Sequence, residues 1–126
     1  MNIKFFKCQH CGNVVVKLVD KNVPVSCCGE NMAELLPNTS DGAGEKHTPV
    51  ITMDGNLVKV VVSTVLHPSV DVHYIQFIVL ETSNGFQMRN LNPGDVPQAE
   101  FVLAEGESVV AAYEFCNLHG LWKTMA

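Results

Sequence analysis

The feature that most restricts the fold of this chain is a group of four cysteines near its N-terminus. They occur as a C-x-x-C pair, Cys8 and Cys11, followed by the directly adjacent pair Cys27 and Cys28. Four thiolates in such a cluster suit a tetrahedral site for zinc or iron. Residues 1–36 are too few to bury a hydrophobic core, so we expect a bound metal to hold them as a small domain.

The adjacent cysteines separate this site from an ordinary zinc ribbon, in which the second half is also C-x-x-C. Cys27 and Cys28 cannot form the same relaxed chelate loop, so we expect distorted angles between the sulfur atoms and the metal. This favours a redox-active iron, with a structural zinc as the alternative; a vicinal disulfide is disfavoured because its ring is strained. His10 lies between two of the cysteines and is interpreted as a bystander.

The rest of the chain, residues 37–126, shows short strands and tight turns and no helical period. A polar stretch at residues 37–44 predicts a linker, and the turn signals Asp54-Gly55 and Asn84-Gly85 predict hairpins. We expect strands at residues 50–53, 57–66, 73–82, 86–89, 100–104 and 108–115. This spacing is typical of a β-sandwich, so the expected fold class is mainly β, with an immunoglobulin-like sandwich after the cysteine-rich domain.

Composition and charge narrow the classes of partner. The chain carries a formal net charge of −5, to which residues 1–36 contribute +1 and residues 37–126 contribute −6. An acidic surface repels nucleic acid and anionic membranes, so we expect neither as a partner. No apolar run reaches the length of a membrane span, and the N-terminus lacks the apolar stretch of a secretory signal. A cytoplasmic location is therefore expected.

A second group of possible metal ligands is spread over the β-rich part. It comprises four histidines and the fifth cysteine: His47, His67, His73, His119 and Cys116. Cys116 and His119 form a C-x-x-H pair, a spacing at which both side chains can bind one metal. Imidazole suits iron, copper, zinc or nickel, and thiolate shifts the preference towards soft or redox-active metals. Taken singly, each histidine is more often an ordinary core or surface residue.

Two alternatives use only part of these residues. A blue-copper electron-transfer site would take His47, Cys116, His119 and a weak Met125 ligand, and it leaves two histidines without a role. A non-catalytic binding module stapled by metal is the other alternative. The metal content distinguishes these alternatives. One copper per chain would indicate the electron-transfer site, zinc alone would indicate the binding module, and two irons per chain would exclude both.

Taken together, the motifs resemble desulfoferrodoxin, the two-iron superoxide reductase. They run in order along nearly the whole chain: Cys8-x-x-Cys11 with Cys27-Cys28, Glu45-Lys46-His47-x-Pro49, His67-Pro68 with His73-Tyr74-Ile75, and Cys116-Asn117-Leu118-His119-Gly120 with Trp122-Lys123. Two details depart from the family pattern. The loop Ser69-Val70-Asp71-Val72 has an unusual sequence, and Leu121 stands where a histidine is common. Neither is a ligand position, and the H-x5-H spacing is kept.

The resemblance implies two mononuclear iron centres. The first lies in a desulforedoxin-like domain, residues 1–36, where the iron is bound by Cys8, Cys11, Cys27 and Cys28. The second lies in an immunoglobulin-like domain, residues 37–126. Its iron is bound by four equatorial histidines and one axial cysteine: His47, His67, His73, His119 and Cys116. The implied reaction is the one-electron reduction of superoxide to hydrogen peroxide without dioxygen release, at the open position opposite the cysteine. It also implies rubredoxin or a similar small electron donor, and a homodimer.

The resemblance places Glu45 and Lys46 beside the second iron. Lys46 would attract superoxide to an acidic protein and help to deliver a proton. The alternative interpretation of Lys46 is an ordinary solvated lysine. Glu45 would occupy the sixth coordination position of the second iron in the ferric resting state. The alternative interpretation of Glu45 is an exposed carboxylate of the linker.

Overall fold

The computed structural model describes residues 3–40, Gly42 and residues 44–126. The chain forms two compact units, Met1–Leu36 and Pro37–Ala126. Asp41 and Ala43, two positions of the expected linker, lie outside the described residues. Among the described residues, no helix has the length and apolar character needed to cross a membrane.

The N-terminal unit consists of very short antiparallel strands. They are β1 (Phe5–Lys7), β2 (Val14–Val16), β3 (Ser26–Cys27), β4 (Glu30–Asn31) and β5 (Ala33–Glu34). The first sheet has the order β2-β1-β5, and β3 pairs with β4 in a separate hairpin. Strands of two or three residues bury little apolar surface, so the unit depends on another source of stability, as expected for a metal-held domain.

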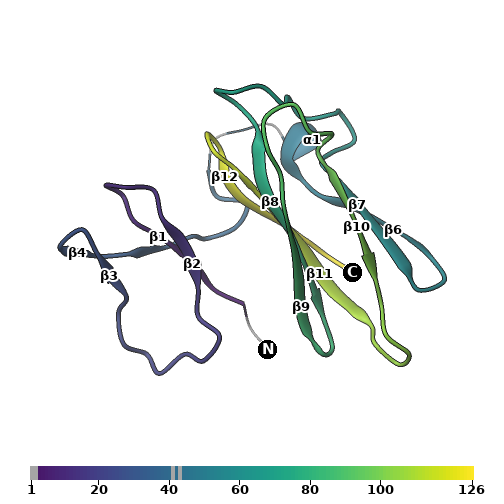
Figure 1. Cartoon of the computed structure of the whole chain (residues 1–126), viewed down its shortest axis with the longest axis horizontal. Coiled ribbons are helices and arrows are strands. Elements are labelled where there is room, and N and C mark those ends of the chain that lie inside the picture. The colour runs from purple at the N-terminus through teal and green to yellow at the C-terminus, as the bar shows by residue number, and fades with distance from the viewer. Residues whose placement is uncertain (1–2, 41, 43) are drawn as a thin grey trace. The chain divides into compact units, whose positions relative to one another are not determined.

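The C-terminal unit is a β-sandwich, drawn in teal to yellow in Figure 1. Its strands are β6 (Val50–Asp54), β7 (Leu57–Val61), β8 (Ile75–Thr82), β9 (Gly85–Asn90), β10 (Gln98–Val102), β11 (Val109–Cys116) and β12 (Gly120–Met125). Within the described ranges, they form a three-stranded sheet of order β10-β7-β6 and a four-stranded sheet of order β12-β11-β8-β9, both antiparallel. The expected mainly β fold, a four-cysteine unit followed by a sandwich, is confirmed.

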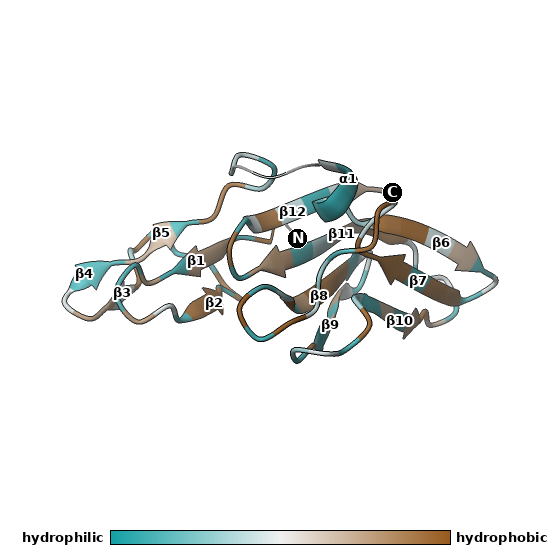
Figure 2. Ribbon diagram, turned by 90° about the horizontal axis from the view of Figure 1, so that it is seen from above, coloured by the Kyte–Doolittle hydropathy of each residue, from teal (hydrophilic) through white to brown (hydrophobic). Residues whose placement is uncertain are grey.

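The hydrophobic core lies between the two sheets. It is built from every second residue of facing strands, as the two-residue period of a strand requires. Val58 and Val60 of β7 pack with Phe101 of β10 and with Ile78 and Leu80 of β8, and all five are fully buried. Figure 2 shows the corresponding brown, hydrophobic stretches on β6 and β7. The same core includes the cysteine that ends β11, so one predicted metal ligand is anchored in the core.

Three local predictions were wrong. The strand expected at 57–66 ends at Val61, because the hydroxyl of Ser63 donates to the carbonyl of Thr48 and the N–H of His67 donates to the carbonyl of Val62, which folds the chain into turns. The strand β12 was not predicted, since its tryptophan and lysine were interpreted only as a motif. The residues Gly44–His47 form one turn of helix, α1, where a linker and loop had been expected.

An irregular pairing between β8 and β11 lies beside the end of β11. Phe115 pairs with Phe77, whereas the next residue, Cys116, pairs with Ile75, so Gln76 is an extra residue on β8. Strict alternation would turn Ile75 away from the core face that Ile78 occupies. The bulge instead places Ile75 in the core, 2% exposed.

Candidate metal centres

A tight hairpin turn brings the two adjacent cysteines of the N-terminal unit to one site. Cys28 and Gly29 are the two central residues of the β3–β4 hairpin, and both have positive φ, at 53° and 78°. Positive φ at both positions is the signature of a type I′ turn. The turn reverses the chain at once, so Cys27 and Cys28 reach the same point without a chelate loop between them.

The four sulfur atoms of this unit converge within 4.8 Å of one another. The Sγ atom of Cys27 lies 3.6 Å from that of Cys11 and 4.0 Å from that of Cys28. Backbone N–H groups point at the sulfurs, since Cys11 donates to Cys8 and Asn13 donates to Cys11, both at 3.5 Å. Donors of this kind stabilise thiolates, so the cluster can present several negative sulfurs to a cation.

The cysteines of this cluster differ in acidity because they share one small space. The backbone N–H of Cys11 lowers the pKa of Cys8 to about 6, whereas the neighbouring thiol of Cys8 raises the pKa of Cys28 to about 12. Four thiolates can therefore coexist here only when a cation offsets their repulsion. The described chain contains no disulfide at these positions, and all of its cysteines are free. The donor set fits a tetrahedral thiolate metal site.

The second group of predicted ligands comes together at one end of the sandwich, where α1 and the ends of β8, β11 and β12 lie (Figure 1). His47 ends α1, His67 and His73 lie in the β7–β8 connection, and Cys116 and His119 flank the β11–β12 turn. Residues that are up to 72 positions apart in the sequence therefore meet at one place.

The four imidazole rings form a closed ring. Successive ring centroids are 4.9 Å apart for His47 and His67, 4.7 Å for His67 and His73, 5.2 Å for His73 and His119, and 4.8 Å for His119 and His47. The diagonal between His47 and His73 is 6.4 Å. One donor atom each from His47, His67, His73 and Cys116 lies within 4.8 Å of the others. The His119 ring adjoins this set of donor atoms without belonging to it.

Hydrogen bonding selects which histidine nitrogen faces the centre. The Nδ1 atom of His67 lies 2.7 Å from the carbonyl oxygen of Pro68, so Nδ1 carries the proton and Nε2 keeps its lone pair. Among the described residues, the Nε2 atoms of His67 and His73 are buried and have no hydrogen-bond partner. Buried polar atoms are rarely left in this state, and a metal ion at the centre would satisfy both.

Burial favours the neutral form of the His67 and His73 imidazoles, which is the form that binds a metal. It lowers the pKa of His67 to about 4, and it lowers the pKa of His73 with help from the charges of His119 and Lys46. Burial also raises the pKa of the Cys116 thiol, while the backbone N–H groups of Leu118 and His119 act in the opposite direction. A cation at this position would favour the thiolate and offset its burial.

Glu45 and Lys46 lie on α1 directly before His47, and both side chains are exposed. The charge of Lys46 contributes to the lowered pKa of His73. The backbone carbonyl of Glu45 accepts hydrogen bonds from the N–H of Val65 at 2.8 Å and from the hydroxyl of Thr64 at 3.2 Å. These bonds tie α1 to the loop that leads to His67.

Comparison with known proteins identifies the family. The sequence profile of the desulfoferrodoxin family matches residues 39–125. A desulfoferrodoxin of Nitratidesulfovibrio vulgaris is 44% identical over 123 residues, which cover 98% of this chain and 96% of that protein.

The chain belongs to the desulfoferrodoxin family.

Solved structures agree with this assignment. The superoxide reductase of Treponema pallidum aligns with a TM-score of 0.84 at 35% identity, covering 98% of this chain and 99% of that one. The one-iron superoxide reductase of Giardia intestinalis aligns with a TM-score of 0.57 at 33% identity, covering 65% of this chain and 97% of that one. The Treponema structure thus matches nearly all of this desulfoferrodoxin chain, and the Giardia structure matches about two thirds of it.

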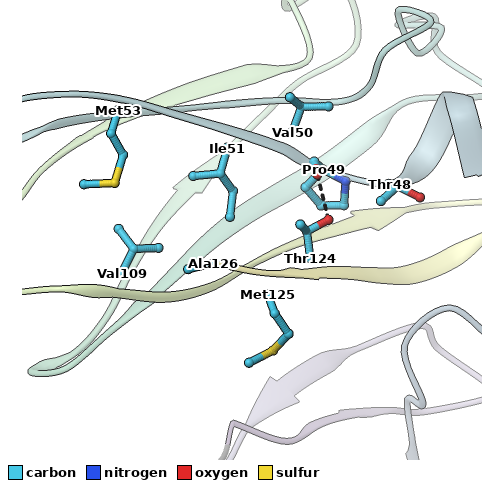
Figure 3. Close-up of a pocket in the computed structure, with 9 residues that line it drawn as sticks. All are labelled: Thr48, Pro49, Val50, Ile51, Met53, Val109, Thr124, Met125 and Ala126. Atoms are coloured by element: carbon cyan, nitrogen blue, oxygen red, sulfur yellow. Dashed lines mark hydrogen bonds between the residues drawn. The ribbon is translucent and has the colours of Figure 1, made fainter.

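The structure gives no support to a blue-copper site in this desulfoferrodoxin. Met125 pairs with Ala111 at the far end of β12, whereas Gly120 at the near end pairs with Cys116. Figure 3 shows Met125 beside an apolar groove of about 400 Å³ that Met53, Val109 and seven other residues line. The two histidines that a copper site would leave without a role belong instead to the ring of four.

Sequence reasoning assigned no role to three residues around the histidine and cysteine centre of this desulfoferrodoxin. Asn117 accepts a hydrogen bond from the N–H of Tyr74 at 2.9 Å and donates one to the carbonyl of Val72 at 3.1 Å, which fixes the loop around His73. Trp122 stacks on the His47 ring at 5.1 Å. In the sequence, the position of Asn117 inside the C-x-x-H motif was the one indication that its side chain could organise the ligand loops.

The third residue is Glu114, which is fully buried two positions before Cys116 on β11. Its neighbours on the same face, Ala112 and Cys116, both belong to the core, so the Glu114 side chain points between the sheets. Within the described part of the chain, neither carboxyl oxygen has a hydrogen-bond partner. Burial raises the pKa of this carboxyl to about 9, so it is a neutral acid at pH 7.

Proposed function

We propose that this chain is a superoxide reductase, which reduces superoxide to hydrogen peroxide by one electron without releasing dioxygen. The observation that carries the proposal is the ring of four histidines, three of which share one group of donor atoms with Cys116, together with the exposed Lys46 that precedes His47. The names of the aligned solved structures and of the family support it.

The proposed cofactors are two mononuclear iron ions. Cys8, Cys11, Cys27 and Cys28 would hold the first; His47, His67, His73, His119 and Cys116 would hold the second. Imidazole and thiolate together suit a redox-active metal that cycles between two oxidation states, and iron bound by these residues would supply the single electron that superoxide receives. The neutral state of the buried His67 imidazole and the N–H groups near Cys116 are properties of the chain that such a site requires.

Lys46 supplies a positive charge beside the proposed second iron in an acidic domain. Residues 37–126 carry a net charge of −6, so an anionic substrate is repelled everywhere except near a local cation. The Lys46 side chain is exposed and its charge acts on the pKa of His73, so we propose that it attracts superoxide and delivers protons through water. Glu45 is proposed to approach the same centre in the oxidised resting state, since it precedes Lys46 on α1.

Further parts of the proposal concern organisation and partners. We assign residues 1–36 to the desulforedoxin-like domain and residues 37–126 to the reductase domain. Rubredoxin or a similar small carrier returns the electron, the protein is a cytoplasmic homodimer, and the acidic surface leaves no role for nucleic acid or membrane.

Metal analysis combined with rapid mixing tests the proposed function. The purified protein should contain two irons per chain, and its reduced form mixed with superoxide should yield peroxide without dioxygen. Dioxygen appearing together with peroxide would indicate dismutation instead. One copper per chain, or zinc alone, would refute the reductase and favour the copper or the stapled-module alternative.

A further inference from the structure

Trp122 is the only tryptophan of the chain, and its indole contacts two of the proposed iron ligands at once. The ring stacks on the imidazole of His47, with centroids 5.1 Å apart and planes 21° from parallel. Its Nε1–H donates a hydrogen bond to the backbone carbonyl of His119 at 3.0 Å. His47 and His119 are 72 positions apart in the sequence, so one side chain joins the two ends of the ligand set.

The three residues form a closed set of contacts. The rings of His47 and His119 meet edge to face with centroids 4.8 Å apart. Trp122 stacks on the first of them and returns to the second through its hydrogen bond. The Trp122 side chain is 7% exposed, and a buried indole N–H needs an acceptor of this kind. A movement of either histidine is therefore resisted by the indole and by the other histidine.

The pairing of β11 with β12 directs the indole towards the metal centre. Trp122 pairs with Glu114, and directly opposed residues of an antiparallel pair share one face of the sheet. Glu114 and Cys116 belong to the face that looks into the sandwich, so Trp122 projects to the side of the sheet that holds the Cys116 thiol. The neighbouring Leu121 pairs with Phe115 and points to the opposite face.

His119 depends on such contacts for its position, because it is half-buried in the turn between β11 and β12. Its carbonyl accepts a hydrogen bond from Trp122 and another from the hydroxyl of Ser40. The other proposed ligands of this centre already form a complete set of four donors within 4.8 Å of one another: His47, His67, His73 and Cys116. The contacts of His119 therefore decide whether a fifth donor joins that set.

The number of donors bears on which metal the centre favours. Three imidazoles and one thiolate make a set of four donors, which suits zinc in its usual tetrahedral geometry. A fifth donor is incompatible with a tetrahedron, whereas imidazole and thiolate in a larger set suit a redox-active metal such as iron. A residue that keeps His119 at the centre therefore acts on the choice of metal as well as on stability.

We propose that Trp122 is a positioning residue that brings His119 to the second centre as its fifth ligand and so makes the site select iron over zinc. This rests on the proposed function, in which His119 binds the second iron. The indole acts through the two histidines and is not a ligand itself, because its N–H is a donor only.

Cobalt(II) bound to the full-length chain tests the number of ligands, because cobalt absorbs several-fold more strongly in the visible region when its site is tetrahedral than when it has five ligands. The four-cysteine site contributes equally in every variant, so difference spectra isolate the second site. Trp122→Leu should give stronger cobalt absorption than the parent. Trp122→Phe, which keeps a ring for His47 but loses the N–H, should give a smaller change in the same direction.

Competition between metals gives the second readout. The chain is reconstituted without oxygen in equal concentrations of iron and zinc, and iron in the second site is measured after oxidation from the absorption band of the Cys116 thiolate. Trp122→Leu should lower the ratio of iron to zinc in this site about tenfold, as is typical when residues that orient ligands are lost. Leu121→Ala is the matched control, because Leu121 is 3% exposed and points away from the site. It should keep the cobalt spectrum and the metal ratio of the parent.

Three outcomes would overturn the role of Trp122. They are a parent cobalt spectrum that is already tetrahedral, a Trp122→Leu variant with the spectrum and metal ratio of the parent, and equal losses of both metals in Trp122→Leu and Leu121→Ala. If Trp122→Leu does not fold, the same comparison is made with Trp122→Phe. Reaction of the reduced parent with superoxide is measured separately, so a parent with five ligands to cobalt that fails to reduce superoxide would refute the proposed function alone.

Discussion

The side-chain oxygen of Asn117 accepts a hydrogen bond from the backbone N–H of Tyr74 at 2.9 Å, although the two residues are 43 positions apart. The same amide donates to the carbonyl of Val72. One side chain thus fastens both sides of His73 to the turn between Cys116 and His119, and the spacing of three proposed ligands depends on it.

Replacing Asn117 by alanine should loosen this connection. We expect Asn117→Ala to lower the affinity of the second site for iron about tenfold, as is typical when residues that orient ligands are lost. The unfolding free energy should fall by about 1–2 kcal/mol, because two hydrogen bonds are removed. Competition with a chelator and urea unfolding measure the two effects. Asn90→Ala on β9 is the control, and equal losses in both variants would contradict a positioning role.

Replacing Cys116 by serine should remove the only sulfur from the second site. We predict that Cys116→Ser abolishes the thiolate-to-iron absorption band of this centre while leaving the absorption of the four-cysteine site unchanged. Visible spectra of the oxidised protein before and after the substitution provide the measurement. A band that persists unchanged would show that Cys116 is not a ligand.

Removing the charge of Lys46 should slow the encounter with superoxide. We expect Lys46→Ala to reduce the second-order rate about tenfold and to weaken its dependence on ionic strength, with iron content unaffected. Rapid mixing at several salt concentrations measures this. Lys59→Ala on β7 removes the same charge from another part of the domain and should have little effect. A rate that falls equally in both variants would mean that only net charge matters.

Replacing Glu114 by leucine should stabilise the sandwich. The buried carboxyl has no hydrogen-bond partner among the described residues, and leucine has a similar volume without the desolvation penalty. We expect Glu114→Leu to raise the unfolding free energy by about 1–3 kcal/mol at pH 7. Glu100→Leu, at an exposed position of β10, should change it by less than about 0.5 kcal/mol. A loss of stability in Glu114→Leu would reveal a partner such as a buried water.

The carboxylate of Glu107 should make the stability depend on pH in the acid range. The hydroxyl of Thr82 and the N–H of Ala104 donate to it, and they lower its pKa below 4.5 in the folded chain. Because the folded pKa is the lower one, this stabilisation is complete above the unfolded pKa and is lost as the pH falls through the folded pKa.

Unfolding by urea at pH 7 and pH 3 checks this dependence. Glu107→Gln should be less stable than the parent at pH 7, and the difference should shrink at pH 3. Glu105→Gln, which changes an exposed carboxylate in the same turn, is the control. A difference between parent and Glu107→Gln that is the same at both pH values would contradict the linkage.

Local sequence patterns predicted the features whose residues lie close together in the sequence. The four-cysteine cluster was visible because C-x-x-C and an adjacent pair are compact motifs, and the strands β6, β8 and β11 were visible from β-branched runs between turn signals. The helical turn α1 was missed because four residues are too few to show a period. Strand β12 was missed because Gly120–Met125 lacks a clear alternation of apolar and polar residues.

The second centre could not be assembled from spacing, because its residues meet only through the tertiary fold. His47 and His119 come from opposite ends of the domain, and no single motif joins them. The resemblance to a family supplied the set, and the structure brings its members together. The contacts of Trp122 with His47 and of Asn117 with Tyr74 join parts of the chain that are far apart in the sequence, so no local pattern shows them.

The extra residue Gln76 on β8 decides which side chain lies opposite Cys116. Its bulge offsets the pairing of β8 with β11 by one position, and a shift of one position turns the side chains of a strand to the opposite face. Ile75 therefore faces the core beside Cys116, although an uninterrupted strand would turn it outward. Deleting Gln76 would close the bulge and leave Ile75 on that face, so this one position can be lost without turning the strand over.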